Sequence, residues 1–453
     1  MGKKPPLRID GKINQQGITL IAKNKKFLIT YQKKIWQTLP PTVKLALRDN
    51  LVYAESNFLP LILDEKELFY GTNFPLLESF CFKNQLYDMP DVELEDKKKP
   101  GEYVRQLFNL KIDFKDHRVN FVAENKIPKF KNQRPVVVIP FSFGKESLVT
   151  AAILQELKIK TVLVFCQEPA QRHEEKFKVP LLKKLSREQK LPTHFMENDP
   201  GLFRYDRAFG FKPYTELGWG NQCTVLALQM IPFVYYYQAN YILFGSEYSN
   251  NLDEMVNGWL VNHFFDHTFL WTVQMGIMVG LLTGRQCTVK SSLEPLEEIT
   301  ILYILTHRYP QFLKYYTSCL AVKPFIKGSL WCGRCYKCHK MYLLATACGF
   351  DTKKLGFKEN LLARQDFLAE YFKTGGDPDC DFAFLILQKK GVDNAAVKKF
   401  ISLMLKRKRV RSWSWYVGFF LKLKKGYNLP PELETKFYKI FQAELNSLGK
   451  YLK

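Results

Sequence analysis

The stretch VVVIPFSFGKESLVTAAIL, residues 136–154, decides the fold. An apolar run of the kind that forms a buried strand ends in a compact loop, and an Ala- and Leu-rich segment of helical character follows at once. A strand that passes through a tight turn into a helix can direct backbone N–H groups and the positive end of the helix dipole at an anion. The loop SFGKES, residues 142–147, is therefore either a helix-capping turn or a phosphate-binding loop.

Strand and helix patterns alternate downstream of this loop. The runs TVLVFCQE (161–168), PTHFMEND (192–199) and YILFGSE (241–247) predict strands, and helical segments, including a long helix through 223–238, lie between them. Continuous apolar strands of this kind are typical of a doubly wound α/β fold, a parallel sheet with helices on both faces. Ligands bind such sheets at the carboxyl ends of the strands, so the loops of interest are 142–147, 166–175, 197–222 and 245–267.

Changes in composition and in the hydrophobic pattern along the chain predict four regions. They are an N-terminal α+β region (1–130), the strand–helix domain (131–315), a cysteine-rich segment (316–350) and a helical basic region (351–453). Within them, the alternating run 111–124 predicts hairpin strands, 91–102 predicts a solvated loop, and 294–310 predicts an amphipathic helix with an acidic first turn.

The composition indicates a sizeable core and an anionic partner. Hydrophobic residues make up 46% of the 453 residues, whereas 67 Lys and Arg against 44 Asp and Glu give a net charge of +23. The apolar stretches 217–246 and 267–284 contain polar residues and favour buried helices over membrane spans. The first residues show no secretory signal, which favours a cytoplasmic protein with reduced thiols.

The segment 403–425 interleaves cations with aromatic residues. Base stacking combined with phosphate contacts would suit RNA. An anionic lipid surface and a basic helical face that covers the rest of the protein are the alternatives.

Four of the ten cysteines follow a metal-binding pattern. Cys319, Cys332, Cys335 and Cys338 are spaced C-x12-C-x2-C-x2-C, and four thiolates suit a closed, structural tetrahedral Zn²⁺ site. An Fe–S cluster and a set of free core cysteines are the alternatives. We expect nearby cations to offset the charge of the thiolates, and these are Arg334, Lys337 and Lys340.

The loop 142–147 resembles the S-G-G-x-D-S loop of the PP-loop ATP pyrophosphatases, which cleave ATP between its α- and β-phosphates. The residues that fit are Ser142, Gly144, Lys145 and Ser147, while Phe143 stands at a glycine and Glu146 at the aspartate. The resemblance implies that the loop holds the β- and γ-phosphates of ATP and that Glu146 holds Mg²⁺. Glu247, at the end of a predicted strand, is a further candidate for metal or ribose.

Longer blocks narrow the resemblance to one family. WCGRCYKCHKMYLLA (331–345), SSLEPLEEI (291–299) and LPPELETKF (429–437) are similar to the ATP-dependent UDP-MurNAc-L-alanyl-L-glutamate epimerases, over about residues 135–450. The resemblance implies an enzyme of peptidoglycan precursor synthesis that adenylates an anionic carboxylate substrate, with His263 and His267 as candidates for base and acid. The 7-cyano-7-deazaguanine synthases, which combine a PP-loop with a four-cysteine zinc site, come next, and PP-loop modification of tRNA is a third reading.

Overall fold

A computed structural model gives the structure of the protein. It describes residues 5–168, 172–205, 209–210, 215–262, 264–319, 330–364, 366–367, 377–392, 394–406, 411–426 and 428–453. The chain forms two compact units, each built from separate segments. The first comprises Met1–Pro140, Ile159–Phe244 and Asn250–Ser291, and the second comprises Phe141–Lys158, Gly245–Ser249 and Ser292–Lys453.

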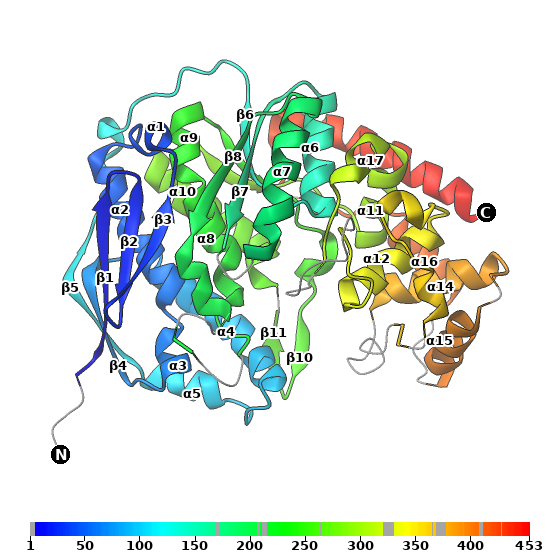
Figure 1. Ribbon diagram of the computed structural model, residues 1–453, viewed down its shortest axis with the longest axis horizontal. Coiled ribbons are helices and arrows are strands. Elements are labelled where there is room, and N and C mark those ends of the chain that lie inside the picture. The colour runs from blue at the N-terminus through cyan, green and yellow to red at the C-terminus, as the bar shows by residue number, and fades with distance from the viewer. Residues whose placement is uncertain are drawn as a thin grey trace. The chain divides into compact units, whose positions relative to one another are not determined.

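The first unit is built on a ten-stranded sheet with the order β12-β9-β6-β7-β8-β3-β2-β1-β4-β5 (Figure 1). Six of its neighbouring pairs are parallel and three are antiparallel. The strands are β1 (Leu7–Asn14), β2 (Gly17–Ala22), β3 (Lys25–Thr30), β4 (Glu67–Phe74), β5 (Lys111–Val119), β6 (Val136–Pro140), β7 (Lys160–Gln167), β8 (Thr193–Asn198), β9 (Tyr241–Phe244) and β12 (Thr288–Ser291).

The expected parallel sheet is confirmed in the part formed by β12, β9, β6, β7 and β8. The four residues Val136–Ile139 of β6 are all buried, and because successive side chains of a strand point to opposite faces, both faces of this strand are covered. The chain order of these strands reverses direction between β6 and β9. In open α/β sheets this reversal marks the place where ligands bind, outside the carboxyl ends of the strands.

The N-terminal residues extend the same sheet. β3 joins β8 through a short antiparallel register, Ile29 opposite Asn198 and Thr30 opposite Glu197. The prediction of hairpin strands in 111–124 is wrong, because residues 111–119 form the single strand β5, which pairs parallel with β4. The prediction of a loop at 91–102 is wrong in its first half, because α4 (Glu78–Glu95) continues to Glu95.

Helices of the first unit pack against this sheet. At Gly11 of β1, a Cβ atom would lie 2.7 Å from Val52 of α2, so the helix approaches the strand closely. The predicted long helix 223–238 is two short helices, α8 and α9, because Pro232 in the first turn of α9 has no N–H to continue the preceding helix. The longer helices are α2 (Pro41–Ser56), α4, α5 (Glu102–Asn109), α7 (Arg172–Gln189), α8 (Gln222–Gln229), α9 (Ile231–Tyr237) and α10 (Phe269–Thr283).

The second unit is helical in the residues that the structure describes. Its longer helices are α6 (Lys145–Glu156), α11 (Glu298–His307), α12 (Tyr336–Ala347), α14 (Pro378–Lys389), α15 (Ala395–Lys406), α16 (Trp413–Phe420) and α17 (Pro431–Leu452). The amphipathic helix expected near 294–310 is instead α11, whose residues 298–306 are all buried. α11 packs against α6, α12, α14 and α17, which leaves it without a solvent face.

Among the described residues, no helix has the length and the apolar character that crossing a membrane requires.

Candidate functional site

The loop after β6 folds into a compact turn at the start of α6. Gly144 is the N-cap of the helix, and its N–H donates to Ser142 Oγ at 3.3 Å. Ser147 Oγ donates to the Gly144 carbonyl at 3.1 Å and lies 3.4 Å from Ser142 Oγ. The two hydroxyls therefore converge at the N-terminus of α6, where the first backbone N–H groups have no partner within the helix. Hydroxyl groups and free N–H groups at a helix N-terminus can together bind an anion.

Phe143, which stands where the resemblance has a glycine, has a backbone conformation that favours glycine. Its φ is +67°, in the left-handed region, where a side chain costs about 1–2 kcal/mol. The ring is fully buried and packs edge-on against Phe141 with centroids 4.7 Å apart, and the Phe143 carbonyl accepts from Thr317 N at 3.0 Å. Burial of the ring offsets the backbone strain, so the glycine conformation persists without the glycine.

Three carboxylates surround the ammonium of Lys145. The side chain of Lys145 is buried, and its Nζ contacts Glu146, donates to Glu298 Oε1 at 2.7 Å and lies 3.5 Å from Glu247 Oε2. One oxygen from each carboxylate lies within 4.8 Å of the others. Glu146 comes from α6, Glu247 follows β9 in the sequence, and Glu298 begins α11, so residues far apart in the chain form one cluster.

Burial and charge act in opposite directions on this cluster. Burial works to lower the pKa of Lys145, but the carboxylates of Glu146, Glu298 and Glu247 outweigh it and hold that pKa well above its usual range. Burial would raise the pKa of Glu298, yet Lys145 and Lys340 keep it well below its ordinary value. For Glu247, burial prevails and raises the pKa. The ammonium and Glu298 are therefore charged at neutral pH.

A second layer of charge holds Glu298 in place. Lys340 of α12 contacts both Glu298 and Asp377, and Lys337 Nζ lies 3.9 Å from Glu298 Oε1. Lys340 and Glu298 are buried and Asp377 is half-buried, so the position of Glu298 is set by α12 as well as by α11. A buried ion network of this kind fixes geometry more than it adds stability.

The three carboxylates could hold a divalent cation. Carboxylate oxygens are the ligands that Mg²⁺ prefers, and three of them converge here beside the loop 142–147. The Lys145 ammonium lies among the same oxygens, so a divalent cation bound by all three would displace it. The displaced Lys145 would then be available to a phosphate at the start of α6.

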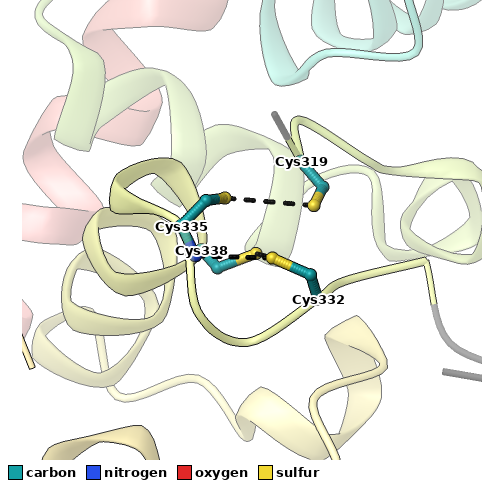
Figure 2. Close-up of side chains that lie close together, drawn as sticks. All are labelled: Cys319, Cys332, Cys335 and Cys338. Carbon is teal, nitrogen blue, oxygen red and sulfur yellow. Dashed lines mark hydrogen bonds between the residues drawn. The ribbon is translucent and has the colours of Figure 1, made fainter. Parts of the chain in front are cut away.

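The four cysteines form a second centre in this unit (Figure 2). The Sγ atoms of Cys319 and Cys335 are 3.9 Å apart, and those of Cys332 and Cys338 are 3.7 Å apart. A disulfide needs about 2.05 Å, whereas a tetrahedron with Zn–S bonds of about 2.3 Å has edges of about 3.8 Å. The sulfur positions therefore fit a tetrahedral thiolate site for Zn²⁺.

The cations expected near the thiols have carboxylate partners. Lys337 Nζ lies 3.9 Å from Glu298 Oε1 and Lys340 contacts Glu298, so the offset of thiolate charge by these two residues stays a prediction. Backbone N–H groups of Arg334 and Cys335 donate to Cys332 Sγ, each at 3.4 Å. Donors of this kind stabilise thiolates without burying a counter-charge.

His267 lies in the first unit, in a cluster that the sequence did not indicate. Its Nε2 is 3.2 Å from Cys223 Sγ and 3.8 Å from Asp266 Oδ1, and Asp266 Oδ2 accepts from Cys223 N at 2.7 Å. Burial raises the pKa of the Cys223 thiol well above its ordinary value, so the thiol is protonated and can donate to His267. His263 lies outside the described residues.

Sequence reasoning missed Glu298 as a member of the Lys145 cluster, and it missed the contacts of Lys340 and Asp377 that hold Glu298 in place. Glu298 had a local signal, because an acidic pair stands directly before a long apolar run. The expected amphipathic helix placed this acidic residue in a solvated first turn and so did not indicate a buried site. Lys340 and Asp377 had no local signal in the sequence. Lys340 contacts both Glu298 and Asp377, and these contacts depend on how α12 packs beside α11. Cys223 looked like one of several scattered core cysteines.

Comparison of the chain with models of protein families and with curated proteins found no match in either case.

Proposed function

We propose that the protein is an ATP pyrophosphatase that adenylates a carboxylate of a small-molecule substrate. The observation that supports this proposal is the convergence of Lys145, Glu146, Glu247 and Glu298 at the start of α6. A buried lysine among carboxylates beside a helix N-terminus and two hydroxyls suits the phosphates of a metal-bound nucleotide. The adenine nucleotide α-hydrolase-like form of the sheet belongs to the same proposal.

In this proposal the residues at the start of α6 bind phosphate, and the three carboxylates bind the metal ion. Ser142, Ser147 and the first N–H groups of α6 hold the β- and γ-phosphates, and Lys145 moves from the carboxylates to the phosphate oxygens. Glu146, Glu247 and Glu298 would hold Mg²⁺, which neutralises charge on the phosphates when bound. A substrate carboxylate oxygen forms a bond to the α-phosphorus, the bond from the α-phosphorus to the bridging oxygen breaks, and pyrophosphate leaves with its electrons.

The resemblance supports the terminal L-glutamate of UDP-MurNAc-L-Ala-L-Glu as the acceptor. A carboxylate opposes removal of its Cα–H proton, because a second negative charge would form beside the first. The acyl-adenylate removes the first charge, so a base takes the proton and an acid returns one to the opposite face. The resemblance alone suggests His263 and His267 for these two roles. Water then releases AMP from the acyl group, and ATP hydrolysis drives the inversion.

The test is product analysis with ATP, Mg²⁺ and a panel of carboxylates that includes UDP-MurNAc-L-Ala-L-Glu. We expect AMP and pyrophosphate to form only with the acceptor, and the rate to fall at least a hundredfold in Glu298→Gln and Ser147→Ala. Ser447→Ala is the matched control, since its hydroxyl contacts Tyr303 and lies outside the cluster. Formation of ADP and phosphate, or an unchanged rate in both cluster variants, would contradict the proposal.

A second candidate function is nitrile or amide synthesis, as in 7-cyano-7-deazaguanine synthase. The observation that favours it is the four-cysteine site in the same chain as the loop 142–147. It predicts AMP formation from carboxydeazaguanine that depends on ammonia, which the epimerase reaction does not use.

A further inference from the structure

Three metal-ligating side chains of different kinds meet in the first unit, in a cluster separate from the four cysteines and from the Lys145 cluster. Cys223 stands in the first turn of α8, and Asp266 and His267 end the short 3₁₀ helix Phe265–His267, just before α10. One sulfur, one carboxylate oxygen and one imidazole nitrogen of the three lie within 4.8 Å of one another. Thiolate, carboxylate and imidazole are the groups that bind zinc and related transition metals in proteins.

The distances favour a shared centre over a proton relay. In a thiol–imidazole–carboxylate relay, the histidine uses one ring nitrogen for the nucleophile and the other for the carboxylate. Here the single nitrogen Nε2 of His267 lies 3.2 Å from Cys223 Sγ and 3.8 Å from Asp266 Oδ1. Tetrahedral Zn²⁺, with bonds of about 2.3 Å to sulfur and about 2.1 Å to nitrogen and oxygen, has corresponding edges of about 3.5 Å and about 3.4 Å. The three atoms are therefore spaced as ligands of one ion.

Hydrogen bonds hold the cluster in this arrangement. The second carboxylate oxygen of Asp266, Oδ2, accepts from Cys223 N at 2.7 Å, which turns Oδ1 toward His267. Trp271 of α10 donates from its indole Nε1 to Thr224 Oγ1 of α8 at 2.9 Å, so the elements that carry the ligands are tied together. Bonds of this kind fix a ligand before the ion arrives, and they are a regular part of metal sites.

The cluster is buried on one side and open on the other. Cys223 and Asp266 are buried, whereas the side chain of His267 is 36% exposed. Three protein ligands leave one coordination position for water or for an oxygen of a ligand, unlike the four-cysteine centre, whose four thiols leave none. Because Mg²⁺ and Ca²⁺ prefer oxygen ligands alone, a thiolate with an imidazole selects a later divalent ion such as Zn²⁺.

We propose that Cys223, Asp266 and His267 form an exchangeable site for a divalent transition-metal ion of the zinc class, with one coordination position open. The ion replaces the thiol proton that lies between Sγ and Nε2, and this proton leaves to solvent. Since the site has one protein ligand fewer than the four-cysteine centre, we expect dialysis to remove its ion while the four-cysteine centre keeps the zinc expected there.

A bound ion would change the role of His267. The ion takes the lone pair of Nε2, so His267 cannot at the same time act as the acid or base that the resemblance suggests. Phosphate binding and adenylation in the proposed function use the residues around Lys145 and do not involve His267. The inference goes beyond the proposed function, and each of the two can fail without the other.

The test is a Co²⁺ titration of dialysed full-length protein, because Co²⁺ replaces Zn²⁺ and absorbs characteristically when a thiolate binds it. We expect one Co²⁺ per chain, with a thiolate-to-cobalt charge-transfer band that added Zn²⁺ abolishes. Cys223→Ser should lose the band, and Asp266→Asn and His267→Ala should weaken Co²⁺ binding at least tenfold. Asp266→Asn keeps an oxygen that can accept from Cys223 N. Cys287→Ser is the matched control, since Cys287 is another buried cysteine of the first unit outside the cluster.

Absence of a charge-transfer band in the wild type overturns the inference. So does a band of equal size in Cys223→Ser, which would place the cobalt at other thiols, such as those of the four-cysteine centre. Equal Co²⁺ affinity in the wild type, Asp266→Asn and His267→Ala also overturns it, because a thiol alone would then bind the ion. Thermal unfolding without added metal shows whether each variant is folded. His267→Ala, at a partly exposed position, keeps the test decisive if Cys223→Ser does not fold.

Discussion

Replacing Lys145 with methionine tests whether the three carboxylates form a cation site. The substitution keeps the length of the buried side chain and removes its charge, which leaves Glu146, Glu247 and Glu298 facing one another within 4.8 Å. Removing one partner from a buried ion cluster costs about 3–5 kcal/mol. Lys340 still contacts Glu298, so we expect the lower end of that range.

Added Mg²⁺ should recover much of this loss. A cation that binds only the folded protein contributes about 2.7 kcal/mol when its free concentration is 100 times its dissociation constant. The wild type should respond less, because Mg²⁺ must first displace the Lys145 ammonium from the same oxygens. The assay is thermal unfolding of both proteins in a MgCl₂ titration, with NaCl at matched ionic strength as the reference.

Two further variants make the result specific. Arg308→Met removes a cation that pairs with Glu156 and Glu444 in the same unit, so it should be destabilised without rescue by Mg²⁺. Glu146→Gln added to Lys145→Met should blunt the rescue, because one ligand is gone. If Mg²⁺ leaves the unfolding temperature of Lys145→Met unchanged, or raises that of the wild type equally, the reasoning about a shared cation position is refuted.

The other predictions concern the thiols, a buried carboxylate and the loop glycine. Cys332→Ser should lose the one zinc ion per chain expected of the wild type, measured by elemental analysis, whereas Cys166→Ser, outside the cluster, should keep it. Burial raises the pKa of Glu55 to about 7 despite Arg204, so its contribution to stability is fully present below the ordinary value of 4.5 and is lost as the pH rises through 7. Urea unfolding should therefore show that the free energy of unfolding of Glu55→Gln, relative to that of the wild type, rises by up to about 3 kcal/mol between pH 4.5 and 8. A difference in free energy of unfolding that does not change with pH would contradict the raised pKa. In Gly144→Ala the new Cβ would lie 2.9 Å from Glu146 Oε2, which is the end of a flexible side chain, and the φ of Gly144 is not positive. The free energy of unfolding should therefore stay unchanged, while the rate of AMP formation drops at least tenfold.

The parallel part of the sheet was predictable because its signal is local. Strands such as Val136–Pro140 are buried on both faces, and the resulting continuous apolar run is visible in the sequence alone. The extension of the sheet by β1–β5 was not predictable, because it depends on the short β3–β8 register at Ile29 and Thr30. A pairing of two residues with a strand more than 160 positions away leaves no pattern in either segment.

The candidate site divides in the same way. Cys332, Cys335 and Cys338 stand in one short segment, so their spacing indicated them, and the resemblance of the loop 142–147 indicated Ser142, Lys145 and Glu146. The Glu298–Lys340 contact was invisible because each residue reads as an ordinary member of its own helix. Charge that is balanced across two helices becomes apparent only when the helices are packed.

The helix α12 carries residues that form or contact both centres of the second unit, the four cysteines and the Lys145 cluster. Cys338 and Lys340 are two positions apart on it, which places them about 200° apart around its axis. One side of the helix therefore holds the Cys338 thiol and the other holds the ammonium that anchors Glu298. A shift of Cys338 would therefore also move Lys340, because both residues are fixed to one helix. The thiol centre and the charge balance around Lys145 are thus joined through α12 without any ligand passing between them.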